Sequence, residues 1–221
     1  MRFPRPIQAV VFDMDGLLID SEALVRAGIV RAAQALGHHF PDALFARTVG
    51  CSDTAYEASV REHFGPDFPM ERFLAREAVE IERAFAAGVC LKTGVIELID
   101  HVERRGLMRA VATSSSRATA RRHLGDHGLA DRFHAIVARE DVTRHKPAPD
   151  PYFEAARRLG MAPAACLALE DSHNGVRSAH AAGMMVVMVP DLLEPTAEMH
   201  GLCVRIASDL HEVHRWIEAA G

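Results

Sequence analysis

Short runs of apolar residues recur along the chain and are separated by longer stretches whose apolar residues have helical spacing. The runs are bounded by polar or glycine-containing turns and lack the alternation of half-exposed strands, which is typical of strands buried on both faces. Such strands, alternating with helices, predict a parallel α/β sheet with right-handed crossovers. The predicted strands are residues 9–12, 107–112, 135–138, 166–169 and 184–189.

Residues 21–88 break this alternation, because they contain no run with the character of a strand. Their apolar positions, for example Leu24, Ala27 and Val30, repeat at helical spacing, and glycines and prolines punctuate the segment. We therefore predict a helical insert after the first strand, with residues 89–94 returning the chain to the sheet.

The composition narrows the possible partners. Among 221 residues, 25 Lys and Arg face 30 Asp and Glu, giving a formal net charge of -5, and no basic run could serve as a nucleic-acid arm. No apolar stretch approaches the length of a membrane span, and the four cysteines are too widely separated for a disulfide framework. We expect a cytoplasmic protein with no nucleic-acid or membrane partner, and a monomer by default.

Asp13 and Asp15 directly follow the first predicted strand, so both should lie at its carboxyl end, where open α/β sheets bind ligands. Two carboxylates so close together raise each other's pKa unless a cation or hydrogen bonds compensate, which indicates a metal and two different roles. Gly16 permits a tight turn beside them. Taken alone, Asp-x-Asp-Gly is equally a polar turn, so its meaning depends on the rest of the chain.

Three further polar segments accompany this turn. Thr113 ends the second predicted strand, where its hydroxyl and the Ser114 N–H would form either an anion site or a helix cap. Lys146 is flanked by prolines that hold its ammonium in one direction. Glu170 and Asp171 directly follow the fourth predicted strand, and adjacent acids there are unfavourable unless a cation lies nearby, although an acidic helix N-terminus explains one of them.

The segments around Asp13, Thr113, Lys146 and Asp171 resemble, in the same order, the four signature segments of the haloacid dehalogenase-like superfamily of phosphatases and mutases. The resemblance covers essentially the whole chain. The insert resembles the helical cap of the subgroup that contains phosphoglycolate phosphatases and β-phosphoglucomutase.

This resemblance implies a division of the chain into two domains. A Rossmann-like parallel α/β core is expected to comprise residues 1–20 and 89–221. An inserted α-helical cap is expected to comprise residues 21–88.

The resemblance also implies roles for the acidic residues. Asp13 would attack phosphorus and form an aspartyl-phosphate, while Asp15 would protonate the leaving oxygen and later activate water. Mg²⁺ would be bound by the Asp13 and Asp171 carboxylates and the Asp15 backbone carbonyl, with Glu170 as a further or water-mediated ligand. Thr113, the Ser114 N–H and Lys146 would surround the phosphoryl group.

These roles predict a Mg²⁺-dependent phosphatase acting on a small phosphate ester, such as a sugar phosphate. A phosphomutase of the β-phosphoglucomutase type and a non-catalytic phosphate- or Mg²⁺-sensing protein are the alternatives. The cap turn Gly50-Cys51-Ser52 is followed by Asp53 where those mutases have Arg, which argues against the first. An acid/base at Asp15 argues against the second.

The 13 histidines include His123 and His127, which have the i, i+4 spacing of a helical metal pair. Without a third ligand, we expect a solvated helix face rather than a zinc site. His173 falls within the Glu170–Gly175 loop and is a candidate for the mouth of the pocket.

Overall fold

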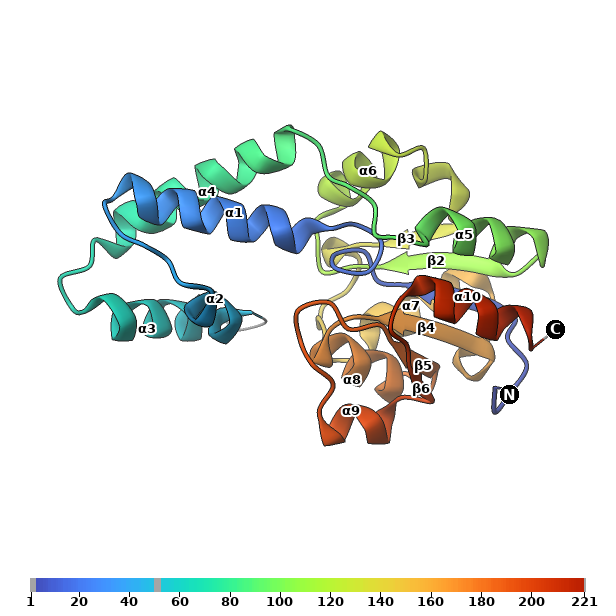
Figure 1. The fold of residues 1–221 in the computed structure, drawn as a ribbon. Coiled ribbons are helices and arrows are strands. Elements are labelled where there is room, and N and C mark those ends of the chain that lie inside the picture. Colours follow the sequence, from blue (N-terminus) through green and yellow to red (C-terminus); the bar gives the residue numbers. More distant parts are fainter. Residues whose placement is uncertain (1–2, 50–52, 221) are drawn as a thin grey trace. The chain divides into compact units, whose positions relative to one another are not determined.

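Six parallel strands form one sheet in this computed structural model, which describes residues 3–49 and 53–220 (Figure 1). The strand order is β3-β2-β1-β4-β5-β6, and every neighbouring pair is parallel. The strands are β1 (Ala9–Phe12), β2 (Met108–Ala112), β3 (Ala135–Val137), β4 (Cys166–Glu170), β5 (Met185–Met188) and β6 (Arg205–Ile206). The predicted α/β fold with a Rossmann-like parallel sheet is confirmed.

The predicted strands are confirmed as β1 to β5, with small shifts at their ends. The sequence analysis misses β6. Its two residues pair with β5 at the edge of the sheet and are only half-buried, so they lack the apolar pattern that marks the other strands.

Helices connect the strands, as parallel pairing requires. Those that belong to the sheet are α5 (Val95–Arg104), α6 (Arg117–Asp126), α7 (Asp150–Leu159), α8 (His173–Ala181), α9 (Ala197–Leu202) and α10 (Leu210–Glu218). Single 3₁₀ turns occur at η1 (Ala130–Arg132), η2 (Arg139–Asp141) and η3 (Pro163–Ala165). None of the helices in the described part of the chain combines the length and apolar character needed to cross a membrane.

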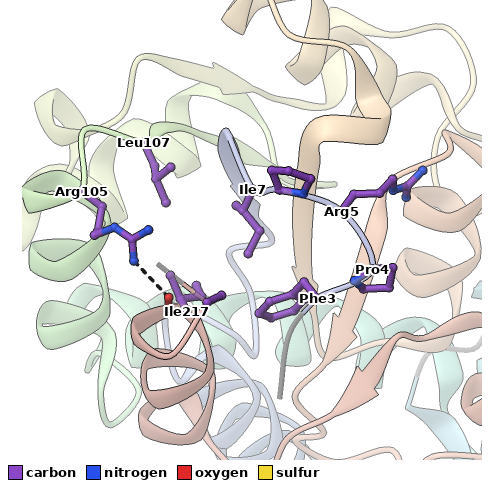
Figure 2. Close-up of a pocket in the computed structure, with 9 residues that line it drawn as sticks. Phe3, Pro4, Arg5, Ile7, Arg105, Leu107 and Ile217 are labelled. Carbon is purple, nitrogen blue, oxygen red and sulfur yellow. Dashed lines mark hydrogen bonds between the residues drawn. The ribbon is translucent and has the colours of Figure 1, made fainter.

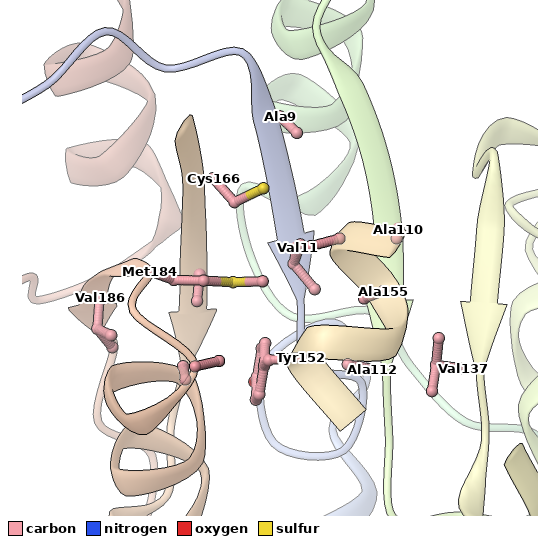
Figure 3. Close-up of a cluster of buried hydrophobic side chains, with 14 of the residues drawn as sticks. Ala9, Val11, Ala110, Ala112, Val137, Tyr152, Ala155, Cys166, Met184 and Val186 are labelled. Carbon is pink, nitrogen blue, oxygen red and sulfur yellow. The ribbon is translucent and has the colours of Figure 1, made fainter. Parts of the chain in front are cut away.

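Small side chains build the core on the face of the sheet that α7 and α8 cover (Figure 3). Val11 and Ala110 from neighbouring strands are buried there beside Ala155 of α7. Because successive strand residues face opposite sides of a sheet, Val10 and Phe12 lie on the other face and are also completely buried. Burial on both faces explains why β1 reads as a continuous apolar run.

The chain divides into two units, a sheet unit (Met1–Ile19 with Leu91–Gly221) and a helical unit (Asp20–Cys90). The helical unit contains α1 (Ser21–Ala35), α2 (Asp42–Thr48), α3 (Asp53–Phe64) and α4 (Met70–Ala86). Gly28 lets α1 approach α4 closely, because a Cβ at this position would lie 2.5 Å from the Ile81 side chain. The role of the helical unit as a cap stays a prediction.

A hollow of about 460 Å³ lies at the amino-terminal end of the sheet (Figure 2). Ile7 and Leu107, which precede β1 and β2, line it together with Ile217 of α10. Arg105 donates a hydrogen bond across it to the Ile217 carbonyl at 3.1 Å. Its described lining includes no carboxylate, and it is at the opposite end of the strands from Asp13.

A buried histidine links α5 to α10 in the sheet unit. His101 is 7% exposed, and its ring centroid lies 4.5 Å from that of His214. Its Nε2 atom has no hydrogen-bond partner among the described residues. Burial lowers the pKa of His101, and the neighbouring His214, Arg105 and Arg104 lower it further, against the opposing charge of Glu218.

We predict that this histidine makes the sheet unit less stable in acid. An unfolded histidine has a pKa of about 6.5. Because the folded pKa is lower, the unfolded chain binds more protons as the pH falls below that value, and stability is lost until the folded pKa is passed. Denaturant unfolding between pH 8 and pH 5, followed through the fluorescence of Trp216 on α10, measures this loss.

His101→Gln should flatten that pH dependence, whereas replacement of the exposed His200 by Asn should leave it as in the wild type. Equal pH dependence in the wild type and in His101→Gln would show that His101 is not responsible.

Candidate active site

The predicted site residues of the sheet lie at the carboxyl ends of three adjacent strands. Asp13 follows β1, Thr113 follows β2, and Glu170 is the last residue of β4. The hydrogen-bond ladder between β1 and β4 continues past the end of β1, because the Asp13 N–H donates to the Leu169 carbonyl at 3.0 Å. Between β1 and β4 the strand order reverses direction, which is where open α/β sheets bind ligands.

Three carboxylates and one ammonium form the centre of the site. Asp13, Glu170 and Asp171 each contribute an oxygen to a group whose atoms all lie within 4.8 Å of one another. Lys146 Nζ donates to Asp13 Oδ1 at 2.5 Å and to Glu170 Oε1 at 2.6 Å. All four side chains are at least nine-tenths buried. The ammonium therefore bridges the ends of β1 and β4.

Two side chains fix the position of Lys146 and its partner. Ser178 of α8 donates to the Ala148 carbonyl at 2.6 Å and thereby holds the segment that carries Lys146. Tyr152 of α7 is completely buried, and its ring centroid lies 5.3 Å from Lys146 Nζ. The Tyr152 hydroxyl donates to Glu170 Oε1 at 2.7 Å.

Glu170 has donors on both oxygens and is completely buried. Oε1 accepts from Lys146 and Tyr152, and Oε2 accepts from the backbone N–H groups of Asp171 and Ser172 and from the Ser172 hydroxyl. Gly175 makes this arrangement possible, because a Cβ there would lie 1.7 Å from Glu170 Oε1. Glu170 is thus an anchor that holds Lys146 against the start of α8.

The pKa values reflect an excess of buried negative charge. Burial raises the pKa of Asp13 to about 7, with Lys146 opposing the rise and Glu170 and Asp15 adding to it. Burial also raises the pKa of Asp171, and the charges of Asp13 and Glu170 raise it further. Burial alone would lower the pKa of Lys146, but the carboxylates outweigh it and raise that pKa.

The donor set fits a divalent cation. Three buried carboxylates face a single ammonium, which leaves two negative charges uncompensated. Asp13 and Asp171 have acceptor capacity for a metal, whereas both oxygens of Glu170 already accept hydrogen bonds. Carboxylate oxygens are the ligands that hard divalent cations take, and such a cation would lower the raised pKa values of both aspartates.

Asp15 occupies a different environment from Asp13, although one residue separates them. Its Oδ2 accepts a hydrogen bond from the Ser115 hydroxyl at 2.7 Å and a longer one from the Thr113 hydroxyl at 3.3 Å. Ser114, the residue predicted to help bind phosphate, is exposed. The end of β2 therefore contacts Asp15 rather than Asp13.

A tight turn separates the two aspartates from the rest of the loop. Gly16 has a φ of +80°, which side-chain-bearing residues rarely adopt, and its N–H donates to the Ile19 carbonyl at 2.9 Å. A Cβ on Gly16 would lie 2.3 Å from Asp171 Oδ2. The glycine that follows Asp15 is thus needed for both the turn and the close approach of Asp171.

Three further expectations from the sequence concern two histidines and the cap turn. His123 is 3% exposed and its pKa is lowered mainly by burial, so the expected solvated face is wrong at this residue. His173 bonds through Nε2 to the Glu194 carbonyl at 2.9 Å. The cap turn Gly50-Cys51-Ser52 lies outside the described residues.

Sequence reasoning also misses three polar contacts. Ser115 is one of three consecutive serines with no signal that separates them, and Tyr152 lies on the buried face of a helix where an aromatic residue is read as core. Ser172 could have been found, because a serine just before an expected helix is the usual N-cap signal.

A family model of haloacid dehalogenase-like hydrolases matches residues 10–189, a stretch that includes Asp13, Thr113, Lys146 and Asp171. The chain belongs to this family. The suspected resemblance is therefore confirmed, and the family's fold accounts for the order of the strands in the sheet unit.

Relatives of this haloacid dehalogenase-like hydrolase cover most of its length. Hexitol phosphatase B of Escherichia coli K12 is 33% identical over 196 residues, which are 86% of each chain. A HAD family hydrolase from Deinococcus radiodurans, solved with phosphate and sodium, is 26% identical and covers 98% of this chain and 97% of its own, with a TM-score of 0.84. CbbY from Rhodobacter sphaeroides, solved with xylulose-1,5-bisphosphate, is 26% identical and covers 93% and 96%, with a TM-score of 0.67.

We predict that Gly175→Ala disrupts the anchor of this haloacid dehalogenase-like hydrolase. The added methyl must displace Glu170, so unfolding should become easier by about 2 kcal/mol. Gly125→Ala is the matched control, because Gly125 lies in α6 with nothing within 4 Å of an added Cβ. That control should gain roughly 1 kcal/mol from helix propensity. Equal denaturation midpoints for both variants would contradict the proposed packing.

Proposed function

We propose that the chain is a Mg²⁺-dependent phosphatase that hydrolyses a small phosphorylated metabolite, a sugar phosphate or similar phosphomonoester, through an aspartyl-phosphate at Asp13. Only the general class of enzyme is established. Membership of the hydrolase family, together with named phosphatases among the relatives, identifies a phosphoric monoester hydrolase. The metal, the intermediate and the substrate belong to the proposal.

The observation that carries the proposal is the contrast between the two aspartates of one turn. Asp13 is buried and bound to the Lys146 ammonium, whereas Asp15 accepts hydrogen bonds from two hydroxyl groups. A nucleophile must be a carboxylate with a free oxygen, and an acid/base must exchange a proton. Different partners for the two side chains support different roles for them.

In the first step, an Asp13 oxygen attacks phosphorus and the bond from phosphorus to the leaving oxygen breaks. Asp15 gives its proton to that oxygen, and the alcohol departs. In the second step, Asp15 takes a proton from a water molecule whose oxygen attacks phosphorus, and the bond to Asp13 breaks. Lys146 contributes a positive charge for the phosphoryl oxygens. The Thr113 hydroxyl, which donates to Asp15 in this structure, would turn to donate to the phosphoryl oxygens when substrate binds.

Asp13 and Asp171 would hold Mg²⁺, together with the Asp15 backbone carbonyl, and Glu170 would act through water or through Lys146. When bound, the ion would neutralise phosphoryl charge as a Lewis acid. Glu170 keeps the ammonium in place when the charge of the bound phosphate changes.

The substrate class is supported by the relatives rather than by a contact in this chain. Hexitol phosphatase B is named for phosphorylated sugar alcohols, and CbbY was solved with a phosphorylated sugar. We propose the same class of partner here, with the helical unit acting as the cap that selects it. The cytoplasmic location and the monomeric state stay predictions.

We predict that Asp13→Asn lowers kcat by on the order of a thousandfold or more, because the amide is close in shape to the carboxylate but cannot attack phosphorus. Phosphate release by the purified variant measures the effect, and circular dichroism checks its fold. Asp131→Asn, at an exposed position of η1, is the control and should keep wild-type activity. Turnover by Asp13→Asn near the wild-type rate would refute the mechanism.

We also predict that phosphate release depends on Mg²⁺. A panel of sugar phosphates, phosphoglycolate and nucleotides, assayed with Mg²⁺ and with chelator, should give release only with the metal. Asp171→Asn should need a higher Mg²⁺ concentration for half-maximal rate, because it removes one proposed ligand. Equal rates with metal and with chelator would refute the assignment, and accumulation of an isomer in place of phosphate would identify a mutase.

A further inference from the structure

A fourth acidic side chain, Asp191, lies at the same end of the sheet as the acids of the candidate active site. It follows β5, the strand next to β4. The Val189 N–H donates to the Glu170 carbonyl at 2.7 Å, so the hydrogen bonds between β4 and β5 continue to the start of this loop. Pro190 then restricts the backbone just before Asp191. The three adjacent strands β1, β4 and β5 thus each carry an acidic residue at or just after their carboxyl ends.

The two carboxylate oxygens of Asp191 differ in their partners. Oδ1 accepts a hydrogen bond from Lys92 Nζ at 2.6 Å. Oδ2 is buried and has no hydrogen-bond partner among the described residues. Burying a carboxylate oxygen without a donor costs free energy, so Oδ2 is suited to accept a hydrogen bond from a bound group.

Gly16 relates this oxygen to the candidate active site. A Cβ built on Gly16 would lie 3.5 Å from Asp191 Oδ2 and 2.3 Å from Asp171 Oδ2, so both oxygens lie on the same side of the turn. Two carboxylate oxygens that approach each other in this way repel unless a cation or a hydrogen-bond donor lies between them. A hollow of about 200 Å³, lined in part by Gly16, Lys92 and Pro190, opens beside the turn and has room for water molecules.

We propose that Asp191 is a positioning residue for the divalent cation at Asp171, with Asp191 Oδ2 accepting a hydrogen bond from a water molecule bound to that cation. This inference rests on the proposed function, because it assigns an outer partner to the Mg²⁺ of that site. Mg²⁺ keeps several of its waters when a protein binds it, and a metal-bound water is a hydrogen-bond donor. An unpartnered carboxylate oxygen close to a metal ligand is the acceptor that such a water needs.

Lys92 determines which oxygen of Asp191 is turned toward the site. Its ammonium binds Oδ1, and its backbone N–H donates to the Leu18 carbonyl at 3.0 Å, which joins Lys92 to the loop after Gly16. The ammonium also compensates the charge of Asp191. Asp191 therefore supplies a fixed acceptor without adding net charge to the excess of buried negative charge at the site.

Asp191→Asn tests the proposal, because an amide is close in shape to a carboxylate. The amide oxygen would still accept from Lys92, since the opposite orientation would set the amide NH₂ against the ammonium. The NH₂ group would then replace Oδ2, and it cannot accept a hydrogen bond from a metal-bound water. Isothermal titration calorimetry of Mg²⁺ into the substrate-free protein should show a Kd that is about 10- to 100-fold higher than that of the wild type.

Two control variants separate this role from the loss of a charge and from the loss of the ion pair. Glu194→Gln removes an exposed charge later in the same loop and should change the Kd for Mg²⁺ by less than about twofold. Lys92→Met breaks the ion pair, keeps the Asp191 carboxylate and takes a positive charge away from the cation, so its Kd should not exceed the wild-type value. Circular dichroism checks that each variant is folded.

An unchanged Kd in Asp191→Asn, or an equal rise in Asp191→Asn and Lys92→Met, would overturn the role of Asp191, while Mg²⁺-dependent phosphate release by the wild type would still support the proposed function. A wild type that binds Mg²⁺ but releases no phosphate from any ester would overturn the proposed function, and the same titrations would still decide the role of Asp191. A wild type that binds no Mg²⁺ would overturn both.

Discussion

The contact of Lys146 with Asp13 and Glu170 is the interaction on which the site depends. Parallel strands bring their carboxyl ends to one edge, so the acids that follow β1 and β4 are forced together out of water. Buried carboxylates at this distance repel each other unless a cation intervenes. The ammonium lies 2.5 and 2.6 Å from its two partners. It compensates one of the three formal negative charges of Asp13, Glu170 and Asp171, and two formal charges stay uncompensated. The same geometry that gathers the acids thus creates a site that fits a divalent cation.

Glu170 shows how the fold sustains that contact. Five hydrogen-bond donors hold the two oxygens of Glu170 in place, so in the proposed mechanism Glu170 can keep Lys146 in position when Asp13 becomes phosphorylated. The anchor depends on Gly175, since any larger residue would occupy the space of the carboxylate. It depends equally on Tyr152, whose hydroxyl reaches Glu170 from a helix that otherwise belongs to the hydrophobic core.

The sequence is informative where one physical requirement dominates. Burial on both faces makes β1 a continuous apolar run, and a polar residue directly after such a run marks the edge where ligands bind, which is why Asp13 and Thr113 could be placed. The sequence is uninformative where several residues of the same type are adjacent, because no pattern distinguishes them. Ser114 is exposed while Ser115 contacts Asp15, and only the path of the turn after β2 decides between them. The half-buried strand β6 has no apolar pattern to detect.

The two aspartates of the turn differ in their neighbours and not in their residue type. Asp13 and Asp15 have the same side chain, yet the ladder of the sheet turns the first toward Lys146 and the turn at Gly16 brings the second to the hydroxyls after β2. An ammonium stabilises the ionised form of a carboxylate, whereas hydroxyls can donate to the ionised form and accept from the protonated one. These partners fit the proposed roles, in which Asp13 attacks as a carboxylate and Asp15 gains and loses a proton in each turnover.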